Sequence, residues 1–193
     1  MTIESLTPEF LLDMGAYDAF SAAQWAANAF VETEGTRAVT VATSGTPADT
    51  NRYAFRGIQN EGGPTRNLFK WNVPTDTYNV ERIDFGRGSN TLLFGDAEPG
   101  GQGNIYTKRA TIGRSFGSAL AQVGAFDSYR GNLDYNFSAS GKWAARVNLT
   151  RSSVGRDFDH NRFNFSAAHG SATHRLLKNT TLRAEGEVGI YRR

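Results

Sequence analysis

The C-terminal part of the chain alternates between two kinds of side chain, and this pattern restricts the fold more than any other feature. In residues 129–137, reading YRGNLDYNF, every odd position is apolar, aromatic or glycine, and every even position is polar. A period of two is typical of a β-strand, because successive side chains point to opposite faces of a sheet. Much the same period recurs in residues 143–150, 162–166 and 182–190. The sequence therefore predicts four successive strands, each with one apolar face and one mostly polar face.

Strands of this kind fit two classes of fold. A soluble antiparallel sheet or sandwich buries its apolar face against a second sheet, whereas a membrane barrel turns that face to lipid. Here the apolar face is rich in Gly, Ala, Tyr and Phe and poor in Ile and Val. Tyr129 and Trp143 lie near strand ends, where barrels carry girdles of aromatic residues. The alternation alone favours the soluble sheet, since transmembrane strands give a weak signal, and these details reduce that preference, so both folds stay open at this point.

The N-terminal part of the chain predicts a small α+β unit. Thr7 is a suitable N-cap for a helix over residues 8–14, which Gly15 would end. A second, alanine-rich helix is predicted from a cap at Asp18 or Ser21 through Ala29. Further along, short strands are predicted at residues 37–42, 53–58 and 80–85, with a loop at 59–67 and a break at Gly86.

Composition and motifs argue against an enzyme and against a nucleic-acid-binding protein. The 21 basic and 19 acidic residues are mixed along the chain, so no basic stripe is available for phosphates. No cysteine is present, and His160, His169 and His174 lack the spacing of metal ligands. The glycines between residues 86 and 103 do not form a nucleotide-binding motif, and no G-x-S-x-G elbow is found. We therefore expect no catalytic residues, no metal and no cofactor.

Membrane association, if it occurs, must use strands. No apolar run approaches the ~18 residues of a transmembrane helix. Residues 1–6 also lack the basic and apolar regions of a signal peptide. A closed barrel is the remaining way for a chain to cross a bilayer with its backbone hydrogen bonds satisfied.

Residues 55–109 carry a series of motifs that resembles one known family. NVERIDFGRGSNTLLFG at residues 79–95 is similar to the plug-domain signature of TonB-dependent receptors, in which V-E-R-[IV]-E leads to R-G-P and then to [VL]-[LF]-[YF]-G. DAEPGGQGNIYTKR at residues 96–109 resembles the continuation of that signature, and FRG at residues 55–57 matches its [IF]-R-G motif. Ser89 replaces the usual proline. The order and spacing of these motifs carry the resemblance.

The resemblance implies a fold and a function. It implies an α+β plug domain over residues 1–110, followed over residues 111–193 by the first antiparallel strands of an incomplete transmembrane β-barrel. It also implies a non-enzymatic transport receptor of the outer membrane. Its partners would be TonB, a ferric siderophore or a similar bulky nutrient, and outer-membrane lipid, with no nucleic acid. The signal peptide, the TonB-binding segment and most barrel strands of the family have no counterpart here, so we expect a truncated chain.

The resemblance also marks two groups of candidate site residues. A plug-barrel latch, which in the family helps hold the plug to the barrel wall, is predicted at Arg56, Glu81, Arg82 and Arg87. Ligand-binding residues on apical loops are predicted at Gln59, Asn60, Arg66, Lys70 and Trp71. Trp71 offers a flat apolar surface, and Arg66 or Lys70 offers a positive charge, which together suit an aromatic or anionic iron chelate.

Less specific interpretations remain beside these. The latch residues could be ordinary solvated strand charges, since most exposed ion pairs contribute less than about 1 kcal/mol. The apical residues could belong to a flexible loop with a partly packed tryptophan. For the whole chain, the alternatives are a stand-alone soluble β-rich ligand-binding protein and a non-functional fragment.

Overall fold

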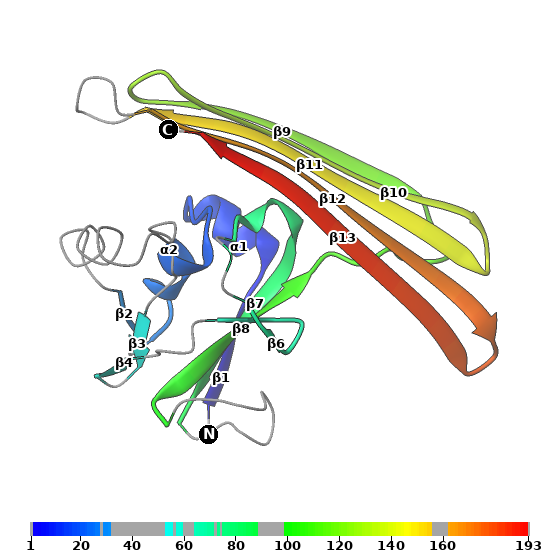
Figure 1. Ribbon diagram of the computed structural model, residues 1–193, viewed down its shortest axis with the longest axis horizontal. Helices are drawn as coiled ribbons and strands as arrows, with labels where there is room; N and C mark the ends of the chain where they lie inside the picture. The colour runs from blue at the N-terminus through cyan, green and yellow to red at the C-terminus, as the bar shows by residue number, and fades with distance from the viewer. Residues whose placement is uncertain are drawn as a thin grey trace. The chain divides into compact units, whose positions relative to one another are not determined.

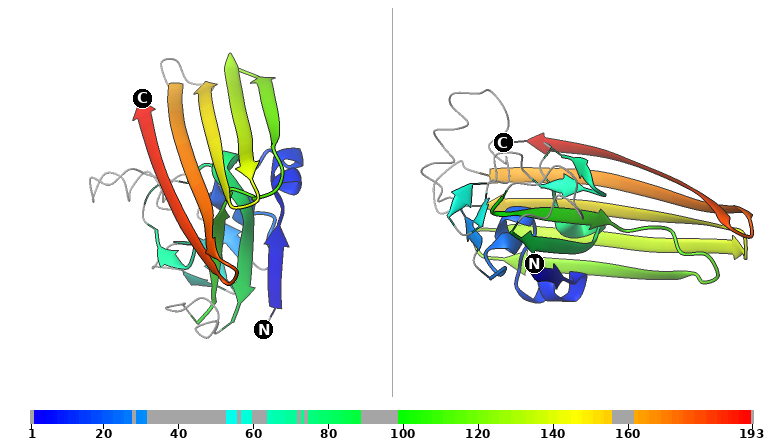
Figure 2. Two further views of the ribbon diagram at one scale, coloured as in Figure 1. Left: turned by 90° about the vertical axis from the view of Figure 1, so that its right-hand side faces the viewer. Right: turned by 90° about the horizontal axis from the view of Figure 1, so that it is seen from below.

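The computed structural model divides the chain into two compact units, Met1–Thr107 and Lys108–Arg193. It describes residues 2–27, 29–31, 53–55, 57–59, 64–71, 73, 75–88, 99–155 and 162–192. Both units consist mainly of antiparallel β-sheet with few helices (Figures 1 and 2). Among the described residues, none of the helices has the length and apolar character needed to span a membrane.

The N-terminal unit is built on a five-stranded sheet in the order β1-β7-β8-β5-β6. The long members are β1 (Thr2–Leu6), β7 (Val80–Arg87) and β8 (Gly101–Thr107), which pair antiparallel. The short strands β5 (Thr65–Arg66) and β6 (Phe69–Lys70) form a hairpin at its edge, where β5 runs parallel to β8. A second sheet holds β2 (Ala29–Val31), β3 (Tyr53–Phe55) and β4 (Ile58–Gln59).

Two short α-helices and one 3-10 helix complete the N-terminal unit: α1 (Pro8–Asp13), α2 (Ala19–Ala23) and η1 (Thr77–Asn79). The first predicted helix is confirmed. The Thr7 hydroxyl accepts a hydrogen bond from Phe10 N at 3.3 Å, and Gly15 ends the turn with a φ of +63°.

The second helix is shorter than predicted. It begins at the expected Asp18 cap, whose carboxylate accepts from Ser21 N at 2.6 Å, but it ends at Ala23 and not at Ala29. Beyond Ala23 the backbone bonds span three residues, so the helix tightens into successive turns. Ala29 instead begins strand β2 and pairs with Phe55 of β3, and this strand pairing replaces the helix that the alanine content favoured.

The backbone conformation of Gly57 separates strands β3 and β4. The strand predicted over residues 53–58 is instead two strands, because Gly57 adopts a φ of +78° and lets β4 fold back on β3. The predicted loop at 59–67 contains β5, and β7 continues through Gly86 to Arg87. The predicted strand at 37–42 lies outside the described residues. Neither β1 nor η1 was predicted from the sequence.

The core of the N-terminal unit is apolar. Its largest fully buried side chains include Leu11, Phe55, Ile83, Phe85 and Ile105, none more than 2% exposed. The rings of Phe55 and Phe85 lie with their centroids 5.8 Å apart. Burial of each such side chain contributes about 1.5–3 kcal/mol, so this cluster holds the two helices on the sheet.

The C-terminal unit is a meander of five long antiparallel strands. They are β9 (Phe116–Gly124), β10 (Ser128–Ser140), β11 (Trp143–Gly155), β12 (Arg162–Leu177) and β13 (Thr180–Arg192), and each pairs with its sequence neighbours. The four predicted strands are confirmed, although all run longer than the alternation indicated, and β9 was not predicted. In the described part of the chain β9 and β13 remain edges, so this sheet is open.

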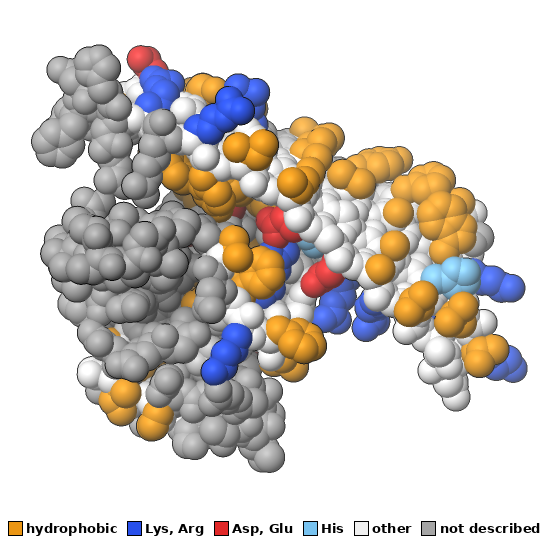
Figure 3. Space-filling model, in the orientation of Figure 1, with side chains coloured by type: hydrophobic (Ala, Val, Ile, Leu, Met, Phe, Trp, Pro, Cys, Tyr) orange, Lys and Arg blue, Asp and Glu red, His pale blue; other side chains and the backbone are white. Residues whose placement is uncertain are grey.

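On β10, β11 and β12 the apolar face lies exposed and the polar face lies mostly buried, whereas the residues of β13 are exposed on both faces. We call the exposed apolar face the apolar band; its side chains include Leu133, Tyr135, Phe137, Val147, Leu149, Val188 and Ile190, which are 40–66% exposed. On the opposite face, Asn136, Asn148 and His169 are at most 1% exposed. One aromatic pair is an exception to this separation of apolar and polar faces. Phe165 is buried on the polar face, and its ring centroid lies 4.4 Å from that of Tyr191, on which it stacks. Hydrophobic side chains recur along the sheet (Figure 3).

Candidate functional site

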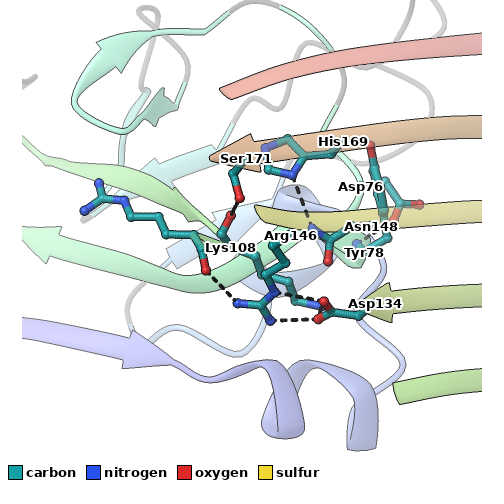
Figure 4. A network of polar contacts seen from close by, with 9 residues as sticks. Asp76, Tyr78, Lys108, Asp134, Arg146, Asn148, His169 and Ser171 are labelled. Atoms are coloured by element: carbon teal, nitrogen blue, oxygen red, sulfur yellow. Dashed lines mark hydrogen bonds and ion pairs between the residues drawn. The ribbon is translucent and has the colours of Figure 1, made fainter. Parts of the chain in front are cut away.

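The polar face of the C-terminal sheet holds a network of charged and amide side chains, drawn in Figure 4. Its centre is the Asp134 carboxylate in β10. Arg146 in β11 binds it with both arms of the guanidinium, from Nε to Oδ1 at 2.8 Å and from Nη2 to Oδ2 at 2.7 Å. Lys108 Nζ lies 3.0 Å from Oδ2. One carboxylate thus meets two cations in the bidentate geometry for which arginine is suited.

Strand register explains why Asp134 and Arg146 meet. Asn136 pairs with Arg146 and Asp134 pairs with Asn148, so Asp134 and Arg146 are diagonal neighbours on one face of two adjacent strands. Diagonal neighbours lie within reach when one of the side chains is long. The short turn between β10 and β11 determines this register, and the register brings the Asp134 carboxylate and the Arg146 guanidinium together.

Asn148 and His169 continue the network along the same face. The Asn148 amide lies 3.3 Å from His169 Nδ1, and the alternative orientation of that amide lets its nitrogen donate to Asp134 Oδ1 at 3.1 Å. His169 Nε2 lies 3.8 Å from a carboxylate oxygen of Glu185 in β13. The network therefore joins β10, β11, β12 and β13.

The backbone of residues 108–115, here the linking segment, is bound to this polar face. Ser171 donates to Lys108 O at 3.2 Å and Thr173 donates to Ala110 O at 2.8 Å. Arg146 Nη1 donates to Arg109 O at 3.2 Å, so the arginine of the central ion pair also holds the segment. Strands β11 and β12 thereby bind the first half of the linking segment.

Asn136 in β10 binds the second half of the linking segment. Its amide oxygen accepts from Thr111 N at 2.9 Å, and its amide nitrogen donates to Thr111 O at 2.9 Å and to Arg114 O at 2.8 Å. Ser138 Oγ accepts from Gly113 N at 2.9 Å. The linking segment has no strand partner of its own here, so these side chains satisfy backbone groups that a sheet would otherwise pair.

The predicted ligand-binding residues fall on β4 and on the β5–β6 hairpin. The Arg66 guanidinium lies 4.5 Å over the Trp71 ring, and Arg66 is only 6% exposed. Lys70 is exposed. The structure therefore brings Arg66 and Trp71 together, as a stacked pair within the N-terminal unit. Gln59 lies in β4, its side chain is not described, and Asn60 lies outside the described residues.

The tip of the β5–β6 hairpin is hydrogen-bonded to strand β8 of the same sheet. Asn67 and Leu68 both adopt positive φ, +50° and +72°, which makes a tight two-residue turn. The side chain of Asn104 in β8 accepts from Leu68 N at 2.9 Å and from Thr65 Oγ1 at 2.7 Å. The hairpin that carries Arg66 is thus held in one position by a buried amide.

Two of the predicted latch residues, Arg82 and Arg87, have partners inside the N-terminal unit. Arg82 Nε binds Asp84 at 3.1 Å, and its guanidinium lies 3.8 Å over the Tyr106 ring. Arg87 forms an ion pair with Glu4 of β1. Glu81 is exposed, and Arg56 lies outside the described residues. Latch contacts to a barrel wall stay a prediction for these residues.

Curated relatives match part of the chain. The probable TonB-dependent receptor BfrD of Bordetella pertussis is 35% identical over 85 residues, which are 42% of this chain and 11% of that protein. The metal-pseudopaline receptor CntO of Pseudomonas aeruginosa is 35% identical over 80 residues, 40% of this chain and 11% of that protein. No family model matches the chain.

Solved structures match nearly all of the chain. The ferric-catecholate import receptor Fiu of E. coli K12 superposes with a TM-score of 0.79 at 18% identity, over 97% of this chain and 26% of that protein. The ferripyoverdine receptor of Pseudomonas aeruginosa superposes with a TM-score of 0.80 at 19% identity, over 97% and 25%. The chain is similar to TonB-dependent receptors. It spans about a quarter of the length of these two receptor structures.

Resemblance to the TonB-dependent receptors directed attention to the N-terminal unit, and the network around Asp134 was not predicted. A signal for it was present, since Asp134 and Arg146 each stand at a polar position of an alternating strand. Pairing them required the register of β10 on β11, which the alternation alone does not supply. No grouping of His, Cys, Asp and Glu suited to a metal ion occurs in the described ranges.

Proposed function

We propose that this chain forms the plug and the first wall strands of an outer-membrane TonB-dependent receptor, which takes up a ferric siderophore or a similar bulky nutrient. The observation that carries this proposal is the inverted polarity of the C-terminal sheet. A sheet in water hides its apolar face, whereas a barrel wall in lipid exposes that face and keeps polar side chains on the lumen side.

The height of the apolar band supports the proposal. On β13 the band runs from Leu182 to Ile190, nine residues whose end-to-end span along the strand is about 26 Å at a rise of ~3.3 Å per residue. A strand tilted by about 40° would cover about 20 Å of membrane thickness, comparable with the ~25 Å apolar belt of outer-membrane barrels. Trp143 and Tyr129 lie toward opposite ends of the strands, as interfacial aromatic residues would.

In this proposal the linking segment stays attached to the barrel wall while the rest of the plug moves. The N-terminal unit would gate the lumen and yield to a pull from TonB, while residues 108–115 stay bound to the wall. Hydrogen bonds to charged groups contribute about 1.5–3 kcal/mol and neutral ones about 0.5–1.5 kcal/mol. Several such bonds, joined to the Asp134 ion pairs, would resist a force that separates weaker contacts elsewhere.

Within the proposed receptor, the apical residues Gln59, Asn60, Arg66, Lys70 and Trp71 would form part of the ligand surface. The pairing of Arg66 with Trp71 supports a fixed position for the indole, because the buried guanidinium already lies over the ring before a ligand arrives. The latch proposed at Arg56, Glu81, Arg82 and Arg87 would require Arg82 and Arg87 to serve two partners, since both already bind acids of the N-terminal unit.

Uptake of labelled iron tests the proposed function. The protein would be produced at its full natural length, in a Gram-negative host that lacks its own siderophore receptors, and supplied with a panel of ⁵⁵Fe-siderophores. We expect accumulation of at least one complex, and we expect it to stop when TonB is deleted. Accumulation that persists without TonB, or a folded outer-membrane protein that accumulates none of the panel, would contradict the proposal.

A further inference from the structure

A cavity of about 430 Å³ lies at one end of the apolar band. It is lined by Arg151, Ser152, Asn164, Ser166, Ile190 and Arg192. The register pairs Arg151 with Ser166, Ser166 with Ile190, and Asn164 with Arg192. These pairs form two neighbouring rows across β11, β12 and β13, so the cavity is assembled by the sheet itself.

The two rows belong to the same face as the apolar band. Arg151 stands two residues beyond Leu149, and Arg192 stands two residues beyond Ile190. Side chains two apart on a strand share a face. The guanidinium groups therefore stand where the apolar band ends, next to Ile190, and away from the network of Asp134.

The charged side chains on the face of the apolar band are all positive, and they lie at the end of the band that holds the cavity. Among the band-facing positions of the five described strands, no Asp or Glu occurs, and the arginines are Arg151, Arg162 and Arg192. Arg162 donates to Ser153 at 3.1 Å in the row beside the cavity. Figure 3 shows Lys and Arg side chains beside hydrophobic ones near that end of the sheet, and further Lys and Arg side chains near the other end.

This combination suits one class of ligand. Within the described residues neither Arg151 nor Arg192 forms an ion pair with a carboxylate, so both guanidinium groups can receive a phosphate in bidentate fashion. The Ser166 hydroxyl and the Asn164 amide add neutral donors. Ile190 and the apolar band continue from the cavity, which suits acyl chains and not a free, fully hydrated anion.

We propose that this cavity binds the phosphate group of an anionic membrane lipid, with the acyl chains of that lipid lying along the apolar band. The inference rests on the proposed function, because it requires the band to face lipid. Phosphate held by two arginines at the band's boundary would fix the height of the wall in the bilayer, as basic residues at membrane surfaces attract anionic headgroups.

Native mass spectrometry of the chain, folded in neutral detergent micelles, tests this proposal with dioleoyl phosphatidylglycerol as the probe. The double variant Arg151→Gln/Arg192→Gln should bind the lipid about tenfold or more weakly, since it loses two hydrogen-bonded ion pairs. The matched control Arg183→Gln changes an arginine of the same strand on the opposite face, and it should bind like the unchanged chain. Ser166→Trp fills the cavity, keeps both arginines, and should also lose the lipid.

Three outcomes would overturn the proposal. Equal retention of phosphatidylglycerol by the unchanged chain and by the folded variants excludes the cavity. Displacement of the lipid by inorganic phosphate at an equal concentration shows a free-anion site in place of a lipid site. Equal binding of dioleoylglycerol, which lacks phosphate, excludes headgroup recognition. If circular dichroism shows that the double variant does not fold, lipid binding by the Ser166→Trp variant alone decides whether the cavity is the site.

Insertion of the chain into uncharged vesicles distinguishes failure of the lipid-site proposal from failure of the proposed function. Vesicles of phosphatidylcholine, which carry no net charge, should accept the chain whether or not the cavity binds an anionic lipid. A chain that enters these vesicles but does not retain phosphatidylglycerol refutes only the lipid site. A chain that stays folded in water and does not enter vesicles refutes the receptor wall itself.

Discussion

The two units of this chain use alternating strands with opposite polarity. In β7 of the N-terminal unit, Ile83 and Phe85 are buried on one face, while Arg82 on the other face is exposed. In β10 of the C-terminal unit, Leu133 and Tyr135 are about half exposed while Asp134 and Asn136 are at most 8% exposed. An alternating pattern establishes that a strand has two different faces, but the surrounding medium decides which of them is covered.

The difference shows how each unit is held together. The N-terminal unit depends on the hydrophobic effect in water, through its cluster of Phe55, Phe85, Ile83 and Ile105. The C-terminal unit has few buried apolar side chains on its polar face and depends on strand pairing and on the network of Asp134. Its stability should therefore require a medium in which the apolar band is not in water.

The largest effect is expected in the core of the N-terminal unit. Phe85→Ala removes a fully buried ring and should cost about 3–5 kcal/mol in free energy of unfolding. Phe69→Ala is the matched control, because Phe69 is 76% exposed and its loss should change little. Urea unfolding followed by Trp25 and Trp71 fluorescence gives both values. Equal costs for the two variants would contradict a core that includes Phe85.

A charge placed on the apolar band should have the next largest effect. Leu149→Arg puts a cation near the middle of the band and should cost about 2–4 kcal/mol when the chain is folded in vesicles. Leu149→Ala controls for loss of side-chain volume and should cost much less. The comparison uses urea titration of vesicle-bound protein. A Leu149→Arg variant as stable as Leu149→Ala would mean that the band faces water.

A smaller effect is expected from the polar face. Asp134→Asn removes the charge shared by Arg146 and Lys108 without changing the shape of the side chain, and should cost about 1.5–3 kcal/mol. Asp127→Asn, in the exposed turn before β10, is the control and should be neutral. Circular dichroism during urea unfolding in detergent micelles measures both. No difference between them would remove the network from any role in holding the sheet.

Much of the fold could be predicted where local rules act alone. The strands β10 to β13 follow from the period of two, and α1 follows from Thr7, Pro8 and Gly15. The second helix was overpredicted because Ala29 belongs to a sheet whose other strand is distant in sequence. The hairpin at Gly57 escaped prediction because one positive φ reversed an otherwise strand-like run.

The candidate site was harder to predict than the fold. Resemblance placed Arg66 and Trp71 among the candidate ligand-binding residues, and the structure adds that the Arg66 guanidinium lies over the Trp71 ring. The network of Asp134 depends on register across two strands and on the backbone of residues 108–115, which no local pattern encodes. Long-range strand pairing, and not residue type, decides which of these side chains meet.

The orientation of the apolar band is tested most directly by two single-cysteine variants. The chain contains no cysteine, so Val188→Cys and Glu187→Cys each give one labelling site on adjacent, exposed positions of β13. Each would carry a fluorescent maleimide in vesicles that contain lipids with spin-labelled acyl chains. If the apolar band faces lipid, the label at position 188 is quenched by the acyl chains and shielded from aqueous iodide, and the label at position 187 shows the reverse. Iodide quenching of both labels alike, or of position 188 alone, would contradict that orientation.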